Sequence, residues 1–150
     1  MKRSEKAKEL FGKGYNCAQA VLCAFADECG MDEDTAYRLS SSFGGGLGRM
    51  REVCGAVSGM SMAAGLLYGY KKGDEPSKKG EHYKLIQSLA GKYKEENGSI
   101  ICRELLSGVA HTDGAVPEAR TNEYYKKRPC AELVECAARI LEEYIEEREK

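Results

Sequence analysis

The sequence predicts an all-α fold, a single-domain helical bundle built around a buried central helix. In several segments apolar residues recur at intervals of three and four, which is the spacing of one helix face. No segment sustains the apolar–polar alternation of a half-buried strand, and the chain has three prolines and no tryptophan. A chain of 150 residues has the usual size of one compact domain, so we expect residues 1–150 to share one core.

The predicted central helix runs from about Glu52 to Tyr68 and follows a glycine-rich loop, Gly44–Gly48. Gly55, Gly59 and Ala63 recur every four residues, so one stripe of this helix carries almost no side chains. We expect another helix to approach closely along that stripe, as stripes of small residues allow in membranes. The other faces are also apolar, which predicts burial nearly all round: Val57, Met60, Met62, Leu66 and Leu67.

Three helices are expected before the loop: one over residues 4–11, one from residue 17 to about 29, and one that follows Asp32 or Asp34 and runs through Leu39. Ser4 can cap the first of them, and Asn16 is a favourable N-cap for the second. Asp32 or Asp34 caps the third.

Three more helices are expected after the central one. A long helix begins at Pro76 or Ser77 and ends near Glu96, and a short helix capped by Ser99 carries Cys102. Residues 109–128 are polar and are expected to form a loop with one turn of helix. The last helix begins at Pro129, because proline suits a first position where no N–H is needed, and runs to about residue 147.

Seven cysteines are many for this length, and the odd number leaves at least one without an intramolecular disulfide partner. Four of them fall in the first turn of a predicted helix and on its apolar face: Cys17, Cys54, Cys102 and Cys130. The other three lie mid-helix or at a helix end and are typical of ordinary core positions: Cys23, Cys29 and Cys136.

A helix N-terminus favours thiolate over thiol, because it presents unpaired N–H groups and about half a positive charge. Four such thiols on four helices could converge in a bundle, although their spacing forms no local zinc knuckle. Simple core packing is the alternative, since cysteine is among the most buried residue types.

Cys54 is the candidate attacking thiol, because Arg49 and Arg51 closely precede it and the central helix begins behind it. Cys17, Cys102 and Cys130 are then the candidate resolving thiols. Four cysteines allow three pairings, and all three stay open.

Several short motifs carry a family resemblance. Residues 16–21 read NCAQAV, residues 43–46 read FGGG and residues 52–59 read EVCGAVSG, and Cys102 and Cys130 follow. With these motifs nearly the whole chain resembles the redox-active proteins named for a C_GCAxxG_C_C pattern. The resemblance implies a redox function in which the four cysteines of the family fall on Cys17, Cys54, Cys102 and Cys130. A related domain stands beside haem-binding segments in split-Soret cytochromes, but this chain has no Cys-x-x-Cys-His, so covalent haem is not implied.

Three functions therefore stay open. The first is that of a thiol-based oxidoreductase, in which two of the four thiols cycle through a disulfide with an unknown redox partner. The second is a four-cysteine metal site that holds zinc or an iron–sulfur cluster. The third is a non-enzymatic interaction module, such as a homodimer that packs through an apolar helix face.

Charge and hydropathy exclude other classes. Lys and Arg number 23 and Asp and Glu number 24, so no basic footprint for nucleic acid is present. No apolar run follows Met1, which predicts no signal peptide, and the longest apolar run, residues 56–70, is too short and interrupted to span a membrane. We expect a cytoplasmic protein.

The remaining motifs favour structural interpretations. The glycine-rich loop lacks the Gly-Lys-Ser/Thr ending of a phosphate-binding loop and follows no strand, so a tight backbone crossing is favoured over phosphate binding. His82 and His111 have no partner at metal-ligand spacing and are expected at the surface.

Overall fold

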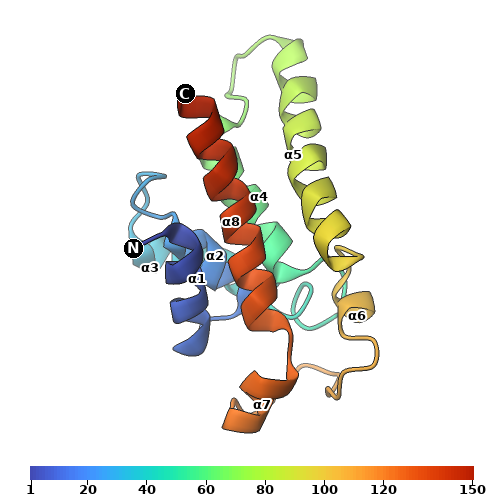
Figure 1. Ribbon diagram of the computed structural model, residues 1–150. Coiled ribbons are helices and arrows are strands. Elements are labelled where there is room, and N and C mark those ends of the chain that lie inside the picture. Colours follow the sequence, from blue (N-terminus) through green and yellow to red (C-terminus); the bar gives the residue numbers. More distant parts are fainter.

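The computed structural model describes all 150 residues and confirms the all-α fold. It has no strand, and its one β-bridge joins Val53 to Ile101. In chain order the helices are α1 Arg3–Gly12, α2 Cys17–Ala24, α3 Glu33–Ser40, the 3₁₀ helix η1 Ser41–Phe43, α4 Gly55–Tyr68, α5 Pro76–Asn97, α6 Cys102–Leu105, α7 Asn122–Lys127 and α8 Cys130–Glu149 (Figure 1).

The bundle is organised around α2 and α8. Figure 1 shows α8 running along the molecule with α1 and α5 packed on either side of it, and α4 lies behind. Helix α2 packs against α1, α3, α4 and α8, and every residue from Ala18 to Ala24 is buried. One hydrophobic core of 29 buried residues joins all the α-helices except α7.

The glycine stripe of α4 packs directly on α2, which confirms the close approach expected from the sequence. A Cβ atom added to Gly59 would lie 2.6 Å from the carbonyl oxygen of Ala18, so the two backbones touch there. The expectation that this helix is buried nearly all round is wrong, however, because Leu66 is 47% exposed and Ser58, Ser61 and Met62 are half-buried. The helix enclosed on all sides is α2.

Some helix ends differ from the sequence-based expectation. Helix α2 ends at Ala24 rather than Cys29, because the chain turns through residues 25–30 to reach Gly30, whose φ is +72°. Helix α1 begins at Arg3, so Ser4 does not cap it. Pro129 is the N-cap of α8 rather than its first residue. Asn16 and Asp32 do cap α2 and α3, as expected.

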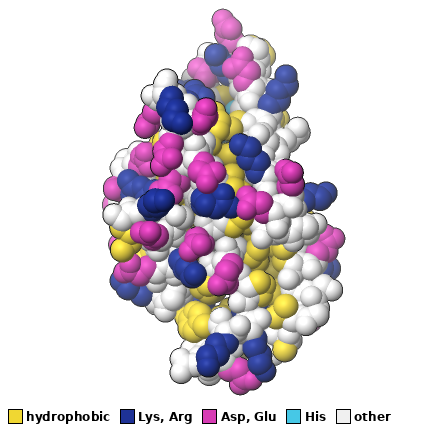
Figure 2. All heavy atoms as spheres, viewed as in Figure 1, with side chains coloured by type: hydrophobic (Ala, Val, Ile, Leu, Met, Phe, Trp, Pro, Cys, Tyr) yellow, Lys and Arg dark blue, Asp and Glu magenta, His cyan; other side chains and the backbone are white.

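No helix is both long and apolar enough to cross a membrane. Figure 2 shows acidic and basic side chains interspersed over one face of the molecule. That face carries no broad patch of a single sign.

Candidate thiol site

The four cysteines singled out from the sequence all stand at helix starts. Cys17, Cys102 and Cys130 are the first residues of α2, α6 and α8, and Cys54 is the N-cap of α4. All four line one cavity of about 260 Å³. All seven cysteines of the chain are free thiols.

Two glycines make this convergence possible. A Cβ atom at Gly55 would lie 3.2 Å from the Cβ of Cys17, and one at Gly46 would lie 2.8 Å from the Cβ of Cys102. Side chains at either position would push the cysteines away from the cavity wall. The glycine-rich loop is therefore a tight crossing, as expected.

A short backbone pairing brings Cys54 and Cys102 to the same side of the cavity. The N–H of Cys54 donates to the carbonyl of Ile100 at 2.7 Å, and the N–H of Cys102 donates to the carbonyl of Glu52 at 2.6 Å. The β-bridge between residues 53 and 101 lies between these bonds. Residues 52–54 are consequently extended, and α4 begins three residues later than the sequence indicated.

Cys17 and Cys130 both line the cavity, and each changes the pKa of the other. A hydrogen bond from the Cys17 thiol to the Cys130 sulfur raises the pKa of Cys17 well above its ordinary value, and burial adds to that rise. The same hydrogen bond, together with the positive charges of Arg128 and Arg120, lowers the pKa of Cys130 to about 7 although burial opposes this. One sulfur of the pair is therefore ready to ionise near neutral pH while the other keeps its proton.

The other two thiols of the cavity stay protonated. Burial raises the pKa of Cys54 to about 11, although its sulfur shares a hydrogen bond of 3.3 Å with the hydroxyl of Tyr93. Burial also raises the pKa of Cys102, although Arg51 donates to its sulfur at 3.8 Å. Helix starts alone do not produce thiolates here, because the loss of solvation outweighs them.

Cys54 does stand at the head of α4, but the two arginines that favoured it as the attacking thiol do not reach it. Arg51 reaches Cys102 instead, and Arg49 points to the loop of residues 109–120, where it donates to the carbonyl of Thr112 at 2.9 Å. The thiol that does have guanidinium groups beside it and a lowered pKa is Cys130.

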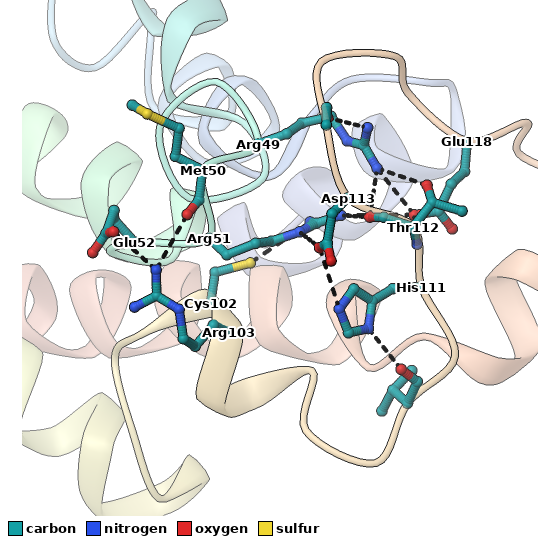
Figure 3. Close-up of polar contacts among 12 residues, drawn as sticks. Arg49, Met50, Arg51, Glu52, Cys102, Arg103, His111, Thr112, Asp113 and Glu118 are labelled. Atoms are coloured by element: carbon teal, nitrogen blue, oxygen red, sulfur yellow. Dashed lines mark hydrogen bonds and ion pairs between the residues drawn. The ribbon is translucent and has the colours of Figure 1, made fainter.

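At one side of the cavity three arginine side chains form ion pairs with a single carboxylate. Glu118 pairs with Arg49 at 3.2 Å and with Arg51 at 3.7 Å (Figure 3). It also pairs with Arg128. Burial opposes ionisation of Glu118, but hydrogen bonds from Thr112 N–H and Arg128 lower its pKa to about 2. The carboxylate therefore stays charged and ties the loop of residues 109–120 to the glycine-rich loop.

An unusual backbone conformation in and just after the glycine-rich loop sets the direction of two of these arginine side chains. Residues 45–49 and Arg51 all have positive φ, and φ is 63° at both Arg49 and Arg51. This left-handed conformation costs about 1–2 kcal/mol for each non-glycine residue. The contacts of the two arginines with Thr112 and Glu118 offset that strain.

The family model described as "Putative redox-active protein (C_GCAxxG_C_C)" matches residues 15–144. The chain belongs to this family. The match extends from the residue before Asn16, the N-cap of α2, into the last helix, and so includes all four cysteines that line the cavity. Comparison with curated proteins and with solved structures gives no match.

As a member of the C_GCAxxG_C_C family the chain has four thiols on one cavity, but they do not form a metal-ligand set. No group of three or more His, Cys, Asp or Glu side chains is placed to hold a metal ion. Cys54 is engaged by Tyr93 and Cys102 by Arg51, so two of the four thiols face other partners. The residues as placed do not fit a four-cysteine zinc site or iron–sulfur cluster.

The residues that shift the pKa values of the cavity thiols were not predicted from the sequence. Arg128 closely precedes Cys130, as Arg49 and Arg51 closely precede Cys54. Its place in the sequence could therefore have predicted a positive charge near the Cys130 thiol. Tyr93 comes from α5, and no local sequence feature connects it with Cys54. Nothing in the local sequence of the polar loop distinguishes Glu118, because its partners come from three segments.

Proposed function

We propose that this redox-active family member is a dithiol that reacts by thiol–disulfide exchange, with Cys130 as the attacking thiolate and Cys17 as the resolving thiol. Both thiols line the same cavity and their pKa values are moved in opposite directions by their interaction, and this observation carries the proposal. Exchange needs an attacking thiolate near ambient pH and a second thiol within reach, and this pair supplies both.

In the proposed reaction the Cys130 thiolate attacks one sulfur of a disulfide substrate and releases the other sulfur as a thiolate. Cys17 then attacks the Cys130 sulfur of the mixed disulfide, and its proton leaves with the second substrate thiol. Two electrons pass from the pair to the substrate, and the protein is left with a Cys17–Cys130 disulfide. A dithiol reductant restores the pair by the reverse exchange.

Cys54 and Cys102 have no attacking role in this scheme. Both line the cavity, but their raised pKa values keep them protonated at neutral pH. A substrate in the cavity would nevertheless lie against all four sulfurs.

The test is to map the disulfide. The anaerobically purified, fully reduced chain is equilibrated in redox buffers, the remaining thiols are alkylated and the digest is analysed by mass spectrometry. We expect the Cys17–Cys130 disulfide to form first, Cys17→Ser to abolish it and Cys23→Ser to leave it unchanged. A first disulfide between any other two cysteines would overturn the assignment, as would stoichiometric iron or zinc bound through these four cysteines.

A further inference from the structure

A buried guanidinium at the cavity has an N–H group without a partner. Arg51 is 7% exposed, and its Nη atoms donate to the sulfur of Cys102 and to the carbonyl of Thr112. Its Nε–H has no hydrogen-bond acceptor, and the nearest carboxylate, that of Asp113, lies 3.7 Å away. One other buried side-chain atom of the molecule lacks a partner, Nδ1 of His82, and it is not in the cavity wall.

Leaving a charged N–H unpaired in a protein interior is costly, and such groups are normally satisfied by protein, water or ligand. The side chain of Asp113 is 77% exposed, so solvent screens its charge from Arg51. Figure 3 shows Arg51 lying between the sulfur of Cys102 and the loop that carries Asp113.

The cavity wall also has an excess of positive charge. The side chains of Arg49, Arg51 and Arg128 are 12%, 9% and 4% exposed, and the only carboxylate among the lining residues is that of Glu118. Arg120 also lines the cavity, so one negative charge stands against four positive charges and the cavity is able to bind a further anion.

Several backbone N–H groups beside the cavity are already paired within the glycine-rich loop. The N–H groups of Arg49, Arg51 and Glu52 donate to carbonyls of the same loop, at 3.0, 3.1 and 2.9 Å. The N–H groups of Gly45 and Gly46 have no backbone acceptor, and the Nε–H of Arg51 is the free side-chain donor, whose position beside Cys102 sets where a ligand would lie.

We infer that this cavity binds a small anion with oxygen acceptors, a carboxylate or an inorganic oxyanion, which accepts a hydrogen bond from Arg51 Nε–H beside Cys102. The volume of about 260 Å³ exceeds the roughly 10–15 Å³ that one water needs, and lies below the roughly 300–1,000 Å³ of sites for drug-sized ligands. That this anion is the redox substrate rests on the proposed function, but its binding does not.

The experiment follows the arginine Nε–H signals of the reduced chain by ¹⁵N NMR during titrations with sodium sulfate and with sodium acetate. We expect one protected signal, assigned to Arg51 by its absence in Arg51→Lys, to shift saturably with at least one of the two salts. Sulfate alone would identify an oxyanion site and acetate alone a carboxylate site. Sodium chloride at equal ionic strength should leave the signal in place.

A matched pair of variants gives a second measurement by calorimetry. Arg51→Lys keeps the positive charge but not the planar N–H donor, and should weaken binding of the effective salt about tenfold. Arg103→Lys is the control, because Arg103 is exposed, pairs with Glu52 and lies outside the cavity wall. An Arg51 signal that no salt shifts in the parent chain, which would mean that the cavity holds water only, overturns the inference. Equal affinities in the two variants would overturn it as well.

A negative result in the anion-binding test can be distinguished from a negative result in the test of the proposed function. The disulfide is mapped without added anion, and the titrations use fully reduced protein without turnover. A Cys17–Cys130 disulfide with no anion binding would leave the exchange reaction standing, and the converse would leave the anion site standing.

Discussion

At the residue scale, burial and neighbouring charge move the pKa values of the cavity thiols in opposite directions. Burial raises the pKa of Cys54 to about 11 because no guanidinium lies close enough to compensate. Cys130 is also buried, but a donated hydrogen bond from Cys17 and the charge of Arg128 outweigh that burial. Reactivity around the cavity is therefore set by these side-chain neighbours.

The first prediction concerns alkylation of Cys130. Its labelling rate should rise between about pH 6 and 8 and then level off, because the thiolate forms around its pKa of about 7. The control is Cys23, whose pKa burial raises to about 11, so its rate should still rise above pH 9. Quenched labelling followed by mass spectrometry measures both profiles, and their midpoints are independent of how accessible each thiol is. A Cys130 midpoint at or above that of Cys23 would remove Cys130 as the attacking thiol.

The second prediction concerns the hydroxyl that meets Cys54. Tyr93→Phe removes the hydrogen bond to the Cys54 sulfur and should lower the free energy of unfolding by about 1 kcal/mol. The pKa of Cys54 should rise further, because this hydrogen bond lowers it. Tyr83→Phe is the control, since Tyr83 is on the same helix and 49% exposed. Chemical unfolding measures both variants, and equal stabilities would show that the Tyr93 hydroxyl contributes nothing.

At the scale of elements, the crossing of α2 and α4 depends on the absence of side chains. The missing Cβ of Gly59 lets α4 touch the backbone of α2, and the missing Cβ of Gly55 leaves room for Cys17. Both glycines lie within helices, where glycine is otherwise destabilising by about 1 kcal/mol relative to alanine. Close packing is the reason that glycine is tolerated at both positions.

The third prediction tests that crossing. Gly59→Ala should lower the free energy of unfolding by about 1–3 kcal/mol, because its Cβ would lie 2.6 Å from the Ala18 carbonyl oxygen and overpacking outweighs helix propensity. Gly65→Ala is a control in the same helix, with nothing within 4 Å of its Cβ, and should stabilise by up to about 1 kcal/mol. Thermal unfolding gives the sign of each change. A stabilised Gly59→Ala variant would mean that the crossing is loose.

The fourth prediction concerns the loop of residues 109–120, which Glu118 holds over the cavity. The folded pKa of Glu118, about 2, is depressed, so its contribution to stability is present above the ordinary value near 4.5 and is lost as pH falls through 2. Glu118→Gln should therefore lower the free energy of unfolding at pH 7, by about 3 kcal/mol.

The difference between Glu118→Gln and the parent should shrink as pH falls below 4.5. Unfolding measured between pH 7 and pH 2.5 tests this dependence. Glu123→Gln is the control, because its pair with Lys127 is exposed and should matter little. A constant difference across this range would show that the charge of Glu118 is not what holds the loop.

At the scale of the whole molecule, the proposed disulfide would join α2 near the N-terminus to α8 near the C-terminus. The fifth prediction is that the oxidised chain unfolds at a higher temperature than the reduced chain. Cross-linking a loop of about a hundred residues stabilises by about 4–5 kcal/mol in the chain-entropy model, if the bond is unstrained. Calorimetry with and without reductant measures the difference, and Cys17→Ser should abolish it. Equal melting temperatures would contradict the pairing.

The arrangement of helices also explains how four widely spaced cysteines of this redox family member come together. The four cysteines of the pattern are far apart in sequence, and the fold places each at the start of a different helix around one cavity. Self-association through an apolar helix face stays a prediction.

The sequence by itself determined the all-α class, the glycine crossing and the four cysteines that line the cavity. Periodicity and capping are local properties, so Asn16 and Asp32 could be recognised as caps and Gly59 as a contact residue. The helix start at Cys17 follows from the same signal, whereas α4 begins three residues later than expected and α6 has Ile101 rather than Ser99 as its N-cap.

Only the tertiary structure decided which thiol is activated and how far α4 is buried. The pKa of Cys130 depends on Cys17 and Arg120, which come from other parts of the chain, and the energy of desolvation depends on every segment packed around a sulfur. Arg49 and Arg51 precede Cys54 in sequence, yet the left-handed turn of the loop directs them to Glu118 and Cys102. Charge and solvation act through space, so neighbours in sequence could not fix the chemistry of the cavity.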